Sequence, residues 1–548
     1  MIINHSNDEI FHFLSDLPTS ESLKLTPEEV ETAYLHVKNS SNDFIPKQFF
    51  IYVHDTLMPI LTKLLNVYVE KSNFPNLLKY ENIYPLYKGK GCKLDPLSYR
   101  PISAVYTLSK ILEKCMQTRL CNALESKLTD NQHGFRKFRS CITAWSVFKH
   151  KLTTALDTRN NLVGAVFIDL RKAFDYVPLL PVLKSLVNNF QVDPSLVKLI
   201  ASFMTARKFS INIANFCSEP FPYNSACPQG STLAPLLFNV FIDDLSKTFQ
   251  LDHLLFADDL VFFIYNNNFP VLMSMLSDGL TKISDWCSNH GVQINFCKSN
   301  FMIIGKDSTN KHPEVKELFL NDLSNKIARV NTFKYLGIFL DDSLNFKIHA
   351  EYVRDKISGS LKCLYKLRRF FNFQLCKTVF HSFVMSTILY GLAIWGTVHH
   401  SFITPIQKLI NRFIWSYSYP NWFSKSKNNR IKIYPSHTDS SLLQKFNLLT
   451  INEYMRLQTL KFVFTILKFG SKVVYLNRIL TFNPKSRRQH LVLPSHQYKI
   501  RETCITYVGS KLWNSLPPNI RDINLSVQCF LCKINVWLLQ CRNSDYTT

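Results

Sequence analysis

The sequence predicts an α+β fold, because short apolar runs of strand length alternate with segments of helical periodicity. The runs GAVFIDL (164–170) and LLFADDLVFFI (254–264) are rich in β-branched and aromatic residues, as strands are. Helical segments lie among them, as in LVKLIASFMTA (196–206). From about residue 350 the pattern becomes mostly helical. We therefore expect a mixed domain followed by a helical region.

Local signals place the first helix and one of the later ones. Thr26 and Glu29 flank Pro27 in the pattern of a capping box with proline at the first helical position, so a helix is expected from about residue 27. Past residue 350, one helix face carries apolar residues, namely Ile357, Leu361, Leu364 and Leu367. The run at 415–440 is rich in Ser, Asn and Lys, which is typical of a loop or linker.

The composition favours a folded protein with a polyanionic partner. The 548 residues are enough for two to four domains, and a hydrophobic fraction of 46% argues against general disorder. Lys and Arg number 64 against 40 Asp and Glu, which gives a net charge of +24. Such a charge favours nucleic acid, because each contact with a phosphate releases condensed counterions. A generally basic, solvated surface is the alternative explanation.

The sequence carries no signal for secretion or for a membrane. Its first residues, MIINHSNDEIFHFLSDL, lack the basic and then apolar layout of a signal peptide. The apolar stretch from Val384 to Trp395 is too short to span a bilayer. The 14 cysteines form no even framework and are best explained as reduced thiols. We therefore expect an intracellular protein, in the nucleus or the cytoplasm, without a membrane partner; the sequence does not indicate an oligomeric state.

Two adjacent aspartates in FADD (256–259) are the strongest candidates for chemistry. Asp258 and Asp259 lie between apolar runs, where neighbouring carboxylates repel each other unless a cation balances them. The pattern fits the turn of a β-hairpin, and an ordinary solvated turn is the alternative. Asp169 ends another apolar strand, 89 residues before Asp258. Three carboxylates from two strand ends can hold two Mg²⁺ ions about 3.5–4 Å apart, so we expect a two-metal site with oxygen ligands.

Other residues near these strands are candidates for binding a nucleotide. Phe174 follows Asp169 by five residues, where an aromatic ring can lie under an incoming sugar and exclude a 2′-hydroxyl; a core phenylalanine is the alternative. Gln229 and Gly230 form a turn before an apolar helix, and glycine there lets the backbone approach a base pair closely. A second Asp pair at 243–244 falls at the end of that helix, and we interpret it as structural.

Ordered blocks of the sequence resemble the reverse transcriptases of non-LTR retrotransposons (LINE-type elements), especially the Jockey-like branch. In chain order the first seven blocks are NIYPLYKGKGCKLDPLSYRPIS (82–103), DNQHGFRKFRS (130–140), FIDLRKAFD (167–175), PQGSTLAPLLF (228–238), FADD (256–259), DWCSNHGVQINFCKSNFMII (285–304) and FKYLGIFLDDSLNFKIH (333–349). Two more blocks resemble thumb and C-terminal segments, namely ILYGLAIWG (388–396) and VGSKLWNSLPPNIRD (508–522). The resemblance therefore extends over most of the chain.

The resemblance implies the fold of a right-hand polymerase and its activity. It implies an N-terminal helical extension over 1–80, fingers and palm over 81–305, a primer-grip segment and helical thumb over 306–415, and a basic C-terminal region over 416–548. The implied activity is that of an RNA-directed DNA polymerase. It transfers nucleotides from dNTPs to the 3′-hydroxyl of a DNA primer on an RNA template.

By position, the resemblance also implies which residues carry out the chemistry. Asp169, Asp258 and Asp259 would be the metal-binding triad. The triad would hold two Mg²⁺ ions, with Mn²⁺ as the alternative. Lys298 would donate a proton to the leaving pyrophosphate, which requires that the site lowers its pKa.

The nucleotide-binding residues follow from the resemblance in the same way. Lys88 and Arg100 would hold the triphosphate of the incoming nucleotide. Phe174 would be the steric gate that selects deoxynucleotides. Gln229 and Gly230 would line the nascent base pair.

Some positions depart from the family pattern, and two alternatives to the implied activity stay open, of which the departures favour the first. Phe138 and Ala234 stand where glycine is usual, and Ser299 replaces a usual Thr. The first alternative is a truncated, catalytically inactive retrotransposon remnant that binds nucleic acid. The second is another right-hand polymerase, such as a group II intron enzyme or an RNA-directed RNA polymerase, although Phe174 argues against the use of ribonucleotides.

Overall fold

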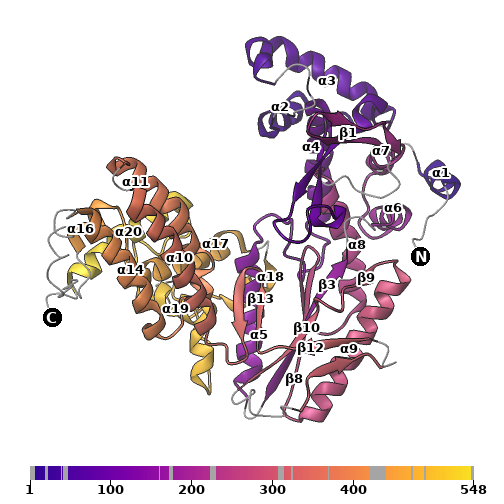
Figure 1. Cartoon of the computed structure of the whole chain (residues 1–548). Coiled ribbons are helices and arrows are strands. Elements are labelled where there is room, and N and C mark those ends of the chain that lie inside the picture. The colour runs from indigo at the N-terminus through magenta and orange to yellow at the C-terminus, as the bar shows by residue number, and fades with distance from the viewer. Residues whose placement is uncertain are drawn as a thin grey trace. The chain divides into compact units, whose positions relative to one another are not determined.

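The structure is a mixed arrangement of helices and sheets, shown in Figure 1 as a computed structural model. It describes residues 7–18, 23–38, 40, 43, 47–158, 161–171, 177–222, 230–305, 314–321, 325–367, 370–418, 440–470, 473–486 and 489–544. The strands and helices alternate along the first part of the chain, and the part after residue 347 is helical. The predicted α+β fold class is therefore confirmed.

The chain divides into two compact units that each combine several segments. The first unit comprises residues 1–136, 168–260 and 279–298. The second comprises residues 137–167, 261–278 and 299–548. All of the predicted site residues that the structure describes belong to the first unit.

The helices of the first unit come mainly from its first two segments. Its α-helices are α1 (Asn7–Ser15), α2 (Pro27–His36), α3 (His54–Glu70), α4 (Thr107–Leu124), α6 (Leu179–Asn188), α7 (Pro194–Met204) and α8 (Ala234–Thr248). Its 3₁₀ helices are η1 (Lys47–Val53), η2 (Asn76–Lys79) and η3 (Pro96–Ser98). The predicted capping box of α2 is confirmed, because the Thr26 side chain accepts from the backbone of Glu29 while the Glu29 carboxylate accepts from the backbone of Thr26.

A small sheet in the first unit, called the fingers sheet below, has the strand order β2-β1-β4-β5, with β6 also paired to β4. Its strands are β1 (Tyr80–Tyr87), β2 (Tyr99–Ala104), β4 (Lys208–Ile213), β5 (Phe216–Cys217) and β6 (Phe221–Pro222). Strands β1 and β2 are antiparallel, and Leu86 is in register with Arg100. Strands β1 and β4 are parallel, which joins the early segment to residues more than a hundred positions later.

The larger sheet, called the palm sheet below, has the order β11-β12-β10-β3-β8-β7, with β9 also paired to β3. Its strands are β3 (Leu162–Arg171), β7 (His253–Phe256), β8 (Asp259–Asn266), β9 (Gln293–Ile294), β10 (Asn300–Ile304), β11 (Glu317–Phe319) and β12 (Lys326–Arg329). Residues 162–168 of β3 are all buried, as expected of a continuous apolar run inside a sheet. Strands β3 and β8 and the helix α9 (Phe269–Asn289) contribute residues to both units.

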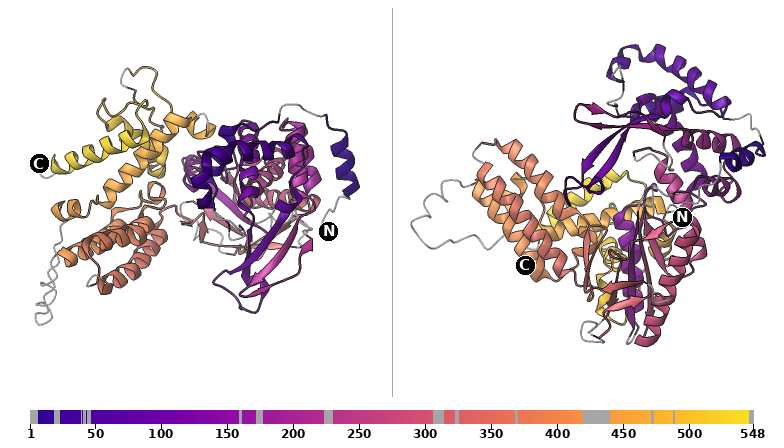
Figure 2. Two further views of the ribbon diagram at one scale, coloured as in Figure 1. Left: turned by 90° about the horizontal axis from the view of Figure 1, so that it is seen from above. Right: turned by 45° about the vertical axis from the view of Figure 1, so that its right-hand side comes forward.

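Most helices of the second unit follow the palm sheet in the chain. They are α5 (Cys141–Leu156), α10 (Lys347–Leu367), α11 (Phe373–Phe380), α12 (Ser386–Leu389), α13 (Leu392–Trp395), α14 (His400–Ser418), α16 (Ser440–Lys445), α17 (Ile451–Phe469), α18 (Val474–Ile479), α19 (Ile505–Ser515) and α20 (Val527–Ser544). The short helices η4 (His381–Met385) and η6 (Lys499–Thr503) and the hairpin β13 (Thr332–Tyr335)–β14 (Ile338–Asp341) complete it. Helix α10 packs against α14 and α11, and Figure 2 shows these orange helices side by side.

The core of the second unit is built around helix α5. Trp145 is fully buried, and its indole N–H donates to the carbonyl of Tyr335 at 3.1 Å. On α10, the predicted apolar face is buried at Ile357, Leu361 and Leu364. Among the helices that the structure describes, none combines the length and the apolar character that crossing a bilayer requires.

Candidate active site

Asp258 and Asp259 lie at the turn of the hairpin formed by β7 and β8. Strand β7 ends at Phe256 and strand β8 begins at Asp259, so the turn is tight. Ala257 between them has a φ of +57°, a left-handed conformation that is unusual for a residue with a side chain. The flanking apolar residues of both strands are buried, which fixes the base of the hairpin while the two carboxylates stay at its tip.

The negative charge of Asp169 affects the pKa values of both aspartates at the hairpin tip. Partial burial raises the pKa of Asp258, and the negative charge of Asp169 raises it further. Partial burial, together with the charges of Asp258 and Asp169, raises the pKa of Asp259 to about 6, although this side chain keeps contact with solvent. The charge of Asp169 therefore disfavours ionisation of both aspartates at the hairpin tip, and Asp258 disfavours ionisation of Asp259.

Asp169 is held by the segment that follows β9. The backbone N–H of Asn295 donates to the carbonyl of Asp169 at 2.8 Å, and the Asn295 side-chain amide donates to Asp169 Oδ2 at 2.9 Å. The Lys298 ammonium lies 3.9 Å from the same oxygen. Pairing of β9 with the end of β3 brings this segment beside Asp169. Asn295 thus restricts both the backbone and the carboxylate of the predicted metal ligand.

A loop around Gln132 supports the hairpin from another side. The backbone of Leu255 donates to Asn131 at 2.9 Å, and the backbone of His133 donates back to Leu255 at 2.8 Å. The Gln132 side-chain oxygen accepts from the backbone N–H of Gly134 at 2.7 Å and from that of Ala257 at 3.2 Å. One buried amide therefore ties the loop to the residue directly before Asp258.

Gly134 has no room for a side chain. A β-carbon built on Gly134 would lie 2.3 Å from the backbone nitrogen of Ala257 and 3.1 Å from its Cα. On the other side, the carbonyl of Gly134 accepts from the Asn239 side chain of α8 at 3.0 Å. Close packing of backbone against backbone therefore sets the position of the hairpin turn, and only glycine allows it.

The predicted nucleotide-binding residues are spread over the fingers sheet and the start of α8. Lys88 is exposed, and its ammonium donates to the carbonyl of Leu97 at 2.7 Å. Arg100 is exposed on β2. Gly230 is exposed with a φ of +117°, and a β-carbon there would lie 3.2 Å from the carbonyl oxygen of Ser103. Two other predicted residues, Phe174 and Gln229, lie outside the described residues.

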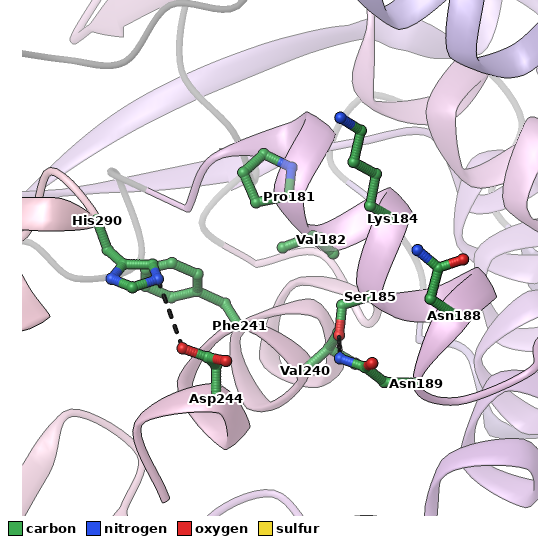
Figure 3. Close-up of a pocket in the computed structure, with 10 residues that line it drawn as sticks. All are labelled: Pro181, Val182, Lys184, Ser185, Asn188, Asn189, Val240, Phe241, Asp244 and His290. Atoms are coloured by element: carbon green, nitrogen blue, oxygen red, sulfur yellow. Dashed lines mark hydrogen bonds and ion pairs between the residues drawn. The ribbon is translucent and has the colours of Figure 1, made fainter. Parts of the chain in front are cut away.

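The second Asp pair makes contacts inside the fold, in agreement with its structural interpretation. Asp243 is buried and accepts from the backbone of Thr129 at 2.8 Å. Asp244 accepts from the Trp286 indole at 2.9 Å, and the His290 ring lies 3.5 Å from it. Figure 3 shows Asp244 and His290 in the wall of a pocket of about 230 Å³ between α6 and α8, whose lining includes none of the three candidate catalytic aspartates.

The three aspartates offer the right atoms for a metal ion but are not drawn together around one point. Among the residues that the structure describes, no three His, Cys, Asp or Glu side chains are placed to hold a metal ion as they stand. The donor set still fits a hard divalent cation, because all three side chains supply carboxylate oxygens and two have raised pKa values that a cation would relieve. Asp169 Oδ2 is instead shared by Asn295 and Lys298.

Residues 88–340 match the family described as reverse transcriptase (RNA-dependent DNA polymerase), and this range contains all three aspartates. These residues are a reverse transcriptase domain. Together with the relatives below, the match confirms the resemblance to polymerases of LINE-type elements. A domain of this family implies a polymerase that depends on divalent metal ions.

Similar proteins include polymerases of mobile elements from Drosophila melanogaster. The RNA-directed DNA polymerase from mobile element jockey is 25% identical over 76% of this chain and 46% of its own length. The probable polymerase from transposon BS is 28% identical over 58% of this chain and 36% of its own length. The chain thus spans less than half the length of these relatives. Among solved structures, apo telomerase from Candida tropicalis aligns with 81% of this chain and 70% of its own, at 11% identity and a TM-score of 0.37.

The reverse transcriptase domain also contains supporting residues that the sequence did not single out. Gln132, Gly134, Asn239 and Asn295 each contact a backbone or a carboxylate of the candidate site. Three of them fall inside blocks that resemble the family: Gln132 and Gly134 in DNQHGFRKFRS, and Asn295 in DWCSNHGVQINFCKSNFMII. Membership of a block is therefore the available signal for these three residues, because an amide or a glycine shows no chemical role of its own in a sequence.

Proposed function

We propose that the chain catalyses RNA-directed DNA synthesis, adding nucleotides from dNTPs to a primer 3′-hydroxyl on an RNA template. The observation that carries the proposal is that the charges of Asp258 and Asp169 both raise the pKa of Asp259, within a reverse transcriptase domain. A hairpin tip where neighbouring carboxylates raise the pKa values of Asp258 and Asp259 is suited to binding cations. The net charge of +24 agrees with nucleic acid as the partner.

Asp169, Asp258 and Asp259 would hold two Mg²⁺ ions, or Mn²⁺ in their place. Bound divalent cations at such a site lower the pKa of an attacking hydroxyl and neutralise the charge on the triphosphate and the leaving oxygen. Asn295 would orient the Asp169 carboxylate through its side-chain amide. Lys298, mostly exposed beside Asp169, would donate a proton to the leaving pyrophosphate.

The incoming nucleotide would contact the fingers sheet and the start of α8. Lys88 and Arg100 are exposed cations that would bind its triphosphate. Gln229 and Gly230 would line the nascent base pair, where the exposed backbone of Gly230 allows close approach. Phe174 would act as the steric gate against the 2′-hydroxyl of ribonucleotides.

The proposed parts of the polymerase follow one another along the chain. Residues 1–80 would form an N-terminal extension, 81–305 the fingers and palm, 306–415 the primer grip and thumb, and 416–548 a basic C-terminal region. We further infer an intracellular setting, in the nucleus or the cytoplasm, where the RNA template and the DNA primer are found.

Primer extension by the purified full chain tests the proposal. A labelled DNA primer annealed to an RNA template should lengthen in the presence of dNTPs and Mg²⁺, and Asp258→Asn should abolish extension. Asp244→Asn is the matched control and should keep extension. It changes an aspartate of the same unit that lines the pocket of Figure 3, and that lining includes none of the three candidate catalytic aspartates. Folded protein that binds RNA without any incorporation would contradict the proposal and favour the inactive remnant.

Exchanging the nucleotides tests the choice of substrate separately. The unsubstituted chain should incorporate dNTPs and reject NTPs. Phe174→Val should then admit NTPs while it keeps the extension with dNTPs. Equal use of both nucleotide classes by the unsubstituted chain would contradict the assignment of the gate and would favour an RNA-directed RNA polymerase.

A further inference from the structure

A fully buried carboxylate on α4, Glu113, binds the segment that leads into α8. Its Oε2 atom accepts from the Ser231 hydroxyl at 2.8 Å and from the backbone N–H of Thr232 at 3.1 Å. Its Oε1 atom accepts from the Ser109 hydroxyl at 3.2 Å. Glu113 is 1% exposed, so these three donors replace the water that a carboxylate would otherwise bind.

Other contacts fix the same segment to α4. The side-chain amide of Gln117, one helical turn after Glu113, donates to the carbonyl of Thr232 at 3.1 Å. The Ser231 hydroxyl in turn accepts from the backbone N–H of Leu233 at 3.1 Å. Residues 231–233 are thus tied to α4 through both backbone and side chains. Gly230, directly before them, is exposed.

Neighbouring groups offset part of the electrostatic cost of burying the Glu113 carboxylate. Burial raises its pKa, while the hydroxyl of Ser231 and the positive charge of Arg207 oppose that rise. Arg207 is itself fully buried and lies 3.8 Å from the carboxylate of Glu81. The backbone N–H of Thr232 can only donate, so its contact requires an acceptor oxygen on Glu113 at that point.

We propose that Glu113 is a positioning residue for nucleotide binding, acting through the segment from Gly230 to Leu233. The proposal rests on the proposed function, because Gln229 and Gly230 are there assigned to the nascent base pair. The backbone of Gly230 can contact the base pair in one defined position only if residues 231–233, which follow it, are anchored to α4. Loss of the anchor should weaken binding of the incoming dNTP and leave the chemistry at the three aspartates nearly unchanged.

Glu113→Leu tests the proposal because it removes both acceptor oxygens and keeps a side chain of similar size. Ser231 and Thr232 then both lose their acceptor on α4. Glutamine would not test it, because its amide oxygen could still accept from both while its N–H₂ group donates to the Ser109 hydroxyl. We expect the KM for the dNTP to rise about 10-fold or more with kcat within about 3-fold, the pattern of lost ground-state binding. Asp243→Asn is the matched control: it changes a buried carboxylate on α8 that accepts from Thr129, away from the segment. Its KM should equal that of the unsubstituted chain.

Hydrogen exchange gives a readout that does not need activity. The amides of Thr232 and Leu233 should exchange slowly in the unsubstituted chain and in Asp243→Asn, and faster in Glu113→Leu. If Glu113→Leu fails to fold, Ser231→Ala removes the hydrogen bond between Ser231 and Glu113 from the other side and should give the same two changes.

Two results would overturn the proposal. One is an unchanged KM for the dNTP in a folded, active Glu113→Leu chain. The other is unchanged exchange at Thr232 and Leu233, which overturns the anchoring whether or not the chain is active. No extension by the unsubstituted chain, with the exchange pattern as expected, would instead count against the proposed function and leave the anchoring role of Glu113 standing.

Discussion

Substitution of Gly134 by alanine should move the catalytic hairpin itself. The added β-carbon would lie 2.3 Å from the backbone nitrogen of Ala257, whereas ordinary contacts of this kind begin at 3.4 Å. The atom it meets belongs to the backbone, so no side-chain rotation can relieve the overlap. Ala257 must therefore shift by about 1 Å, and Asp258 follows it in the chain. On the far side, the hydrogen bond from Asn239 holds Gly134 in place.

The size of the effect follows from that shift. A misplacement of about 1 Å in a reacting group can lower a rate about 100-fold. Overpacking of a well-packed backbone contact typically lowers the free energy of unfolding by about 1–3 kcal/mol. We therefore expect Gly134→Ala to lose about 100-fold in kcat for primer extension, with a melting temperature only a few degrees lower. The rate should fall far more than the folded fraction does.

Single-turnover primer extension with saturating dNTP and Mg²⁺ measures this rate directly. The matched control is Gly359→Ala on α10, where nothing lies within 4 Å of the added β-carbon. This control should keep the rate and gain up to about 1 kcal/mol of stability, because alanine favours a helix over glycine. A Gly134→Ala chain that extends primers within about 3-fold of the unsubstituted rate would refute the argument that Gly134 sets the hairpin position.

Three further predictions follow from individual contacts. Asn295→Ala should lower kcat about 10–100-fold and raise the Mg²⁺ requirement, measured by titration of extension, because Asp169 loses its orienting amide. Asp259, with a pKa raised to about 6, binds its proton more tightly in the folded chain. The bound proton stabilises the fold below about pH 4, and this stabilisation is lost as the pH rises through 6. In chemical denaturation without divalent metal ions, the free energy of unfolding should therefore fall by about 1 kcal/mol over that interval, a figure already reduced for solvent screening. Asp259→Asn should remove this change. Burial lowers the pKa of Lys149 to about 8, so stability should rise by up to about 3 kcal/mol from pH 8 to 10.5 in chemical denaturation, and Lys149→Met should remove that rise.

Local features of the fold were predictable because short stretches of sequence determine them. The hairpin around FADD needs only two apolar runs and a turn, and the capping box of α2 needs only Thr26 and Glu29. The division into two units was not predictable in this way. Its boundaries cut through β3 and β8, so it depends on which distant segments pack together, and a propensity scale does not contain that information.

The supports of the candidate site were harder to predict than its carboxylates. A pair of aspartates between apolar runs signals chemistry by its electrostatic cost. Asn295 and Gln132 carry no such signal, because a surface amide and a bridging amide look alike in a sequence. Lys149 shows the same limit: its ammonium is buried against the carbonyl of Ile394, 245 residues later, and only the folded chain reveals that partner.

Phe138 shows how a departure from the family can be understood once the backbone is known. Its φ of +63° lies in the left-handed region, where glycine is free of strain and a phenylalanine costs about 1–2 kcal/mol. The glycine that is usual at this position thus suits the left-handed backbone conformation that Phe138 adopts here. The ring of Phe138 stacks on that of Phe469 at 5.0 Å, a contact that a glycine could not make. Phenylalanine at this position therefore strains the backbone but adds a ring contact. The loop around Gln132 keeps its hydrogen bonds to the hairpin. This departure from the family pattern is thus no sign by itself that activity is lost.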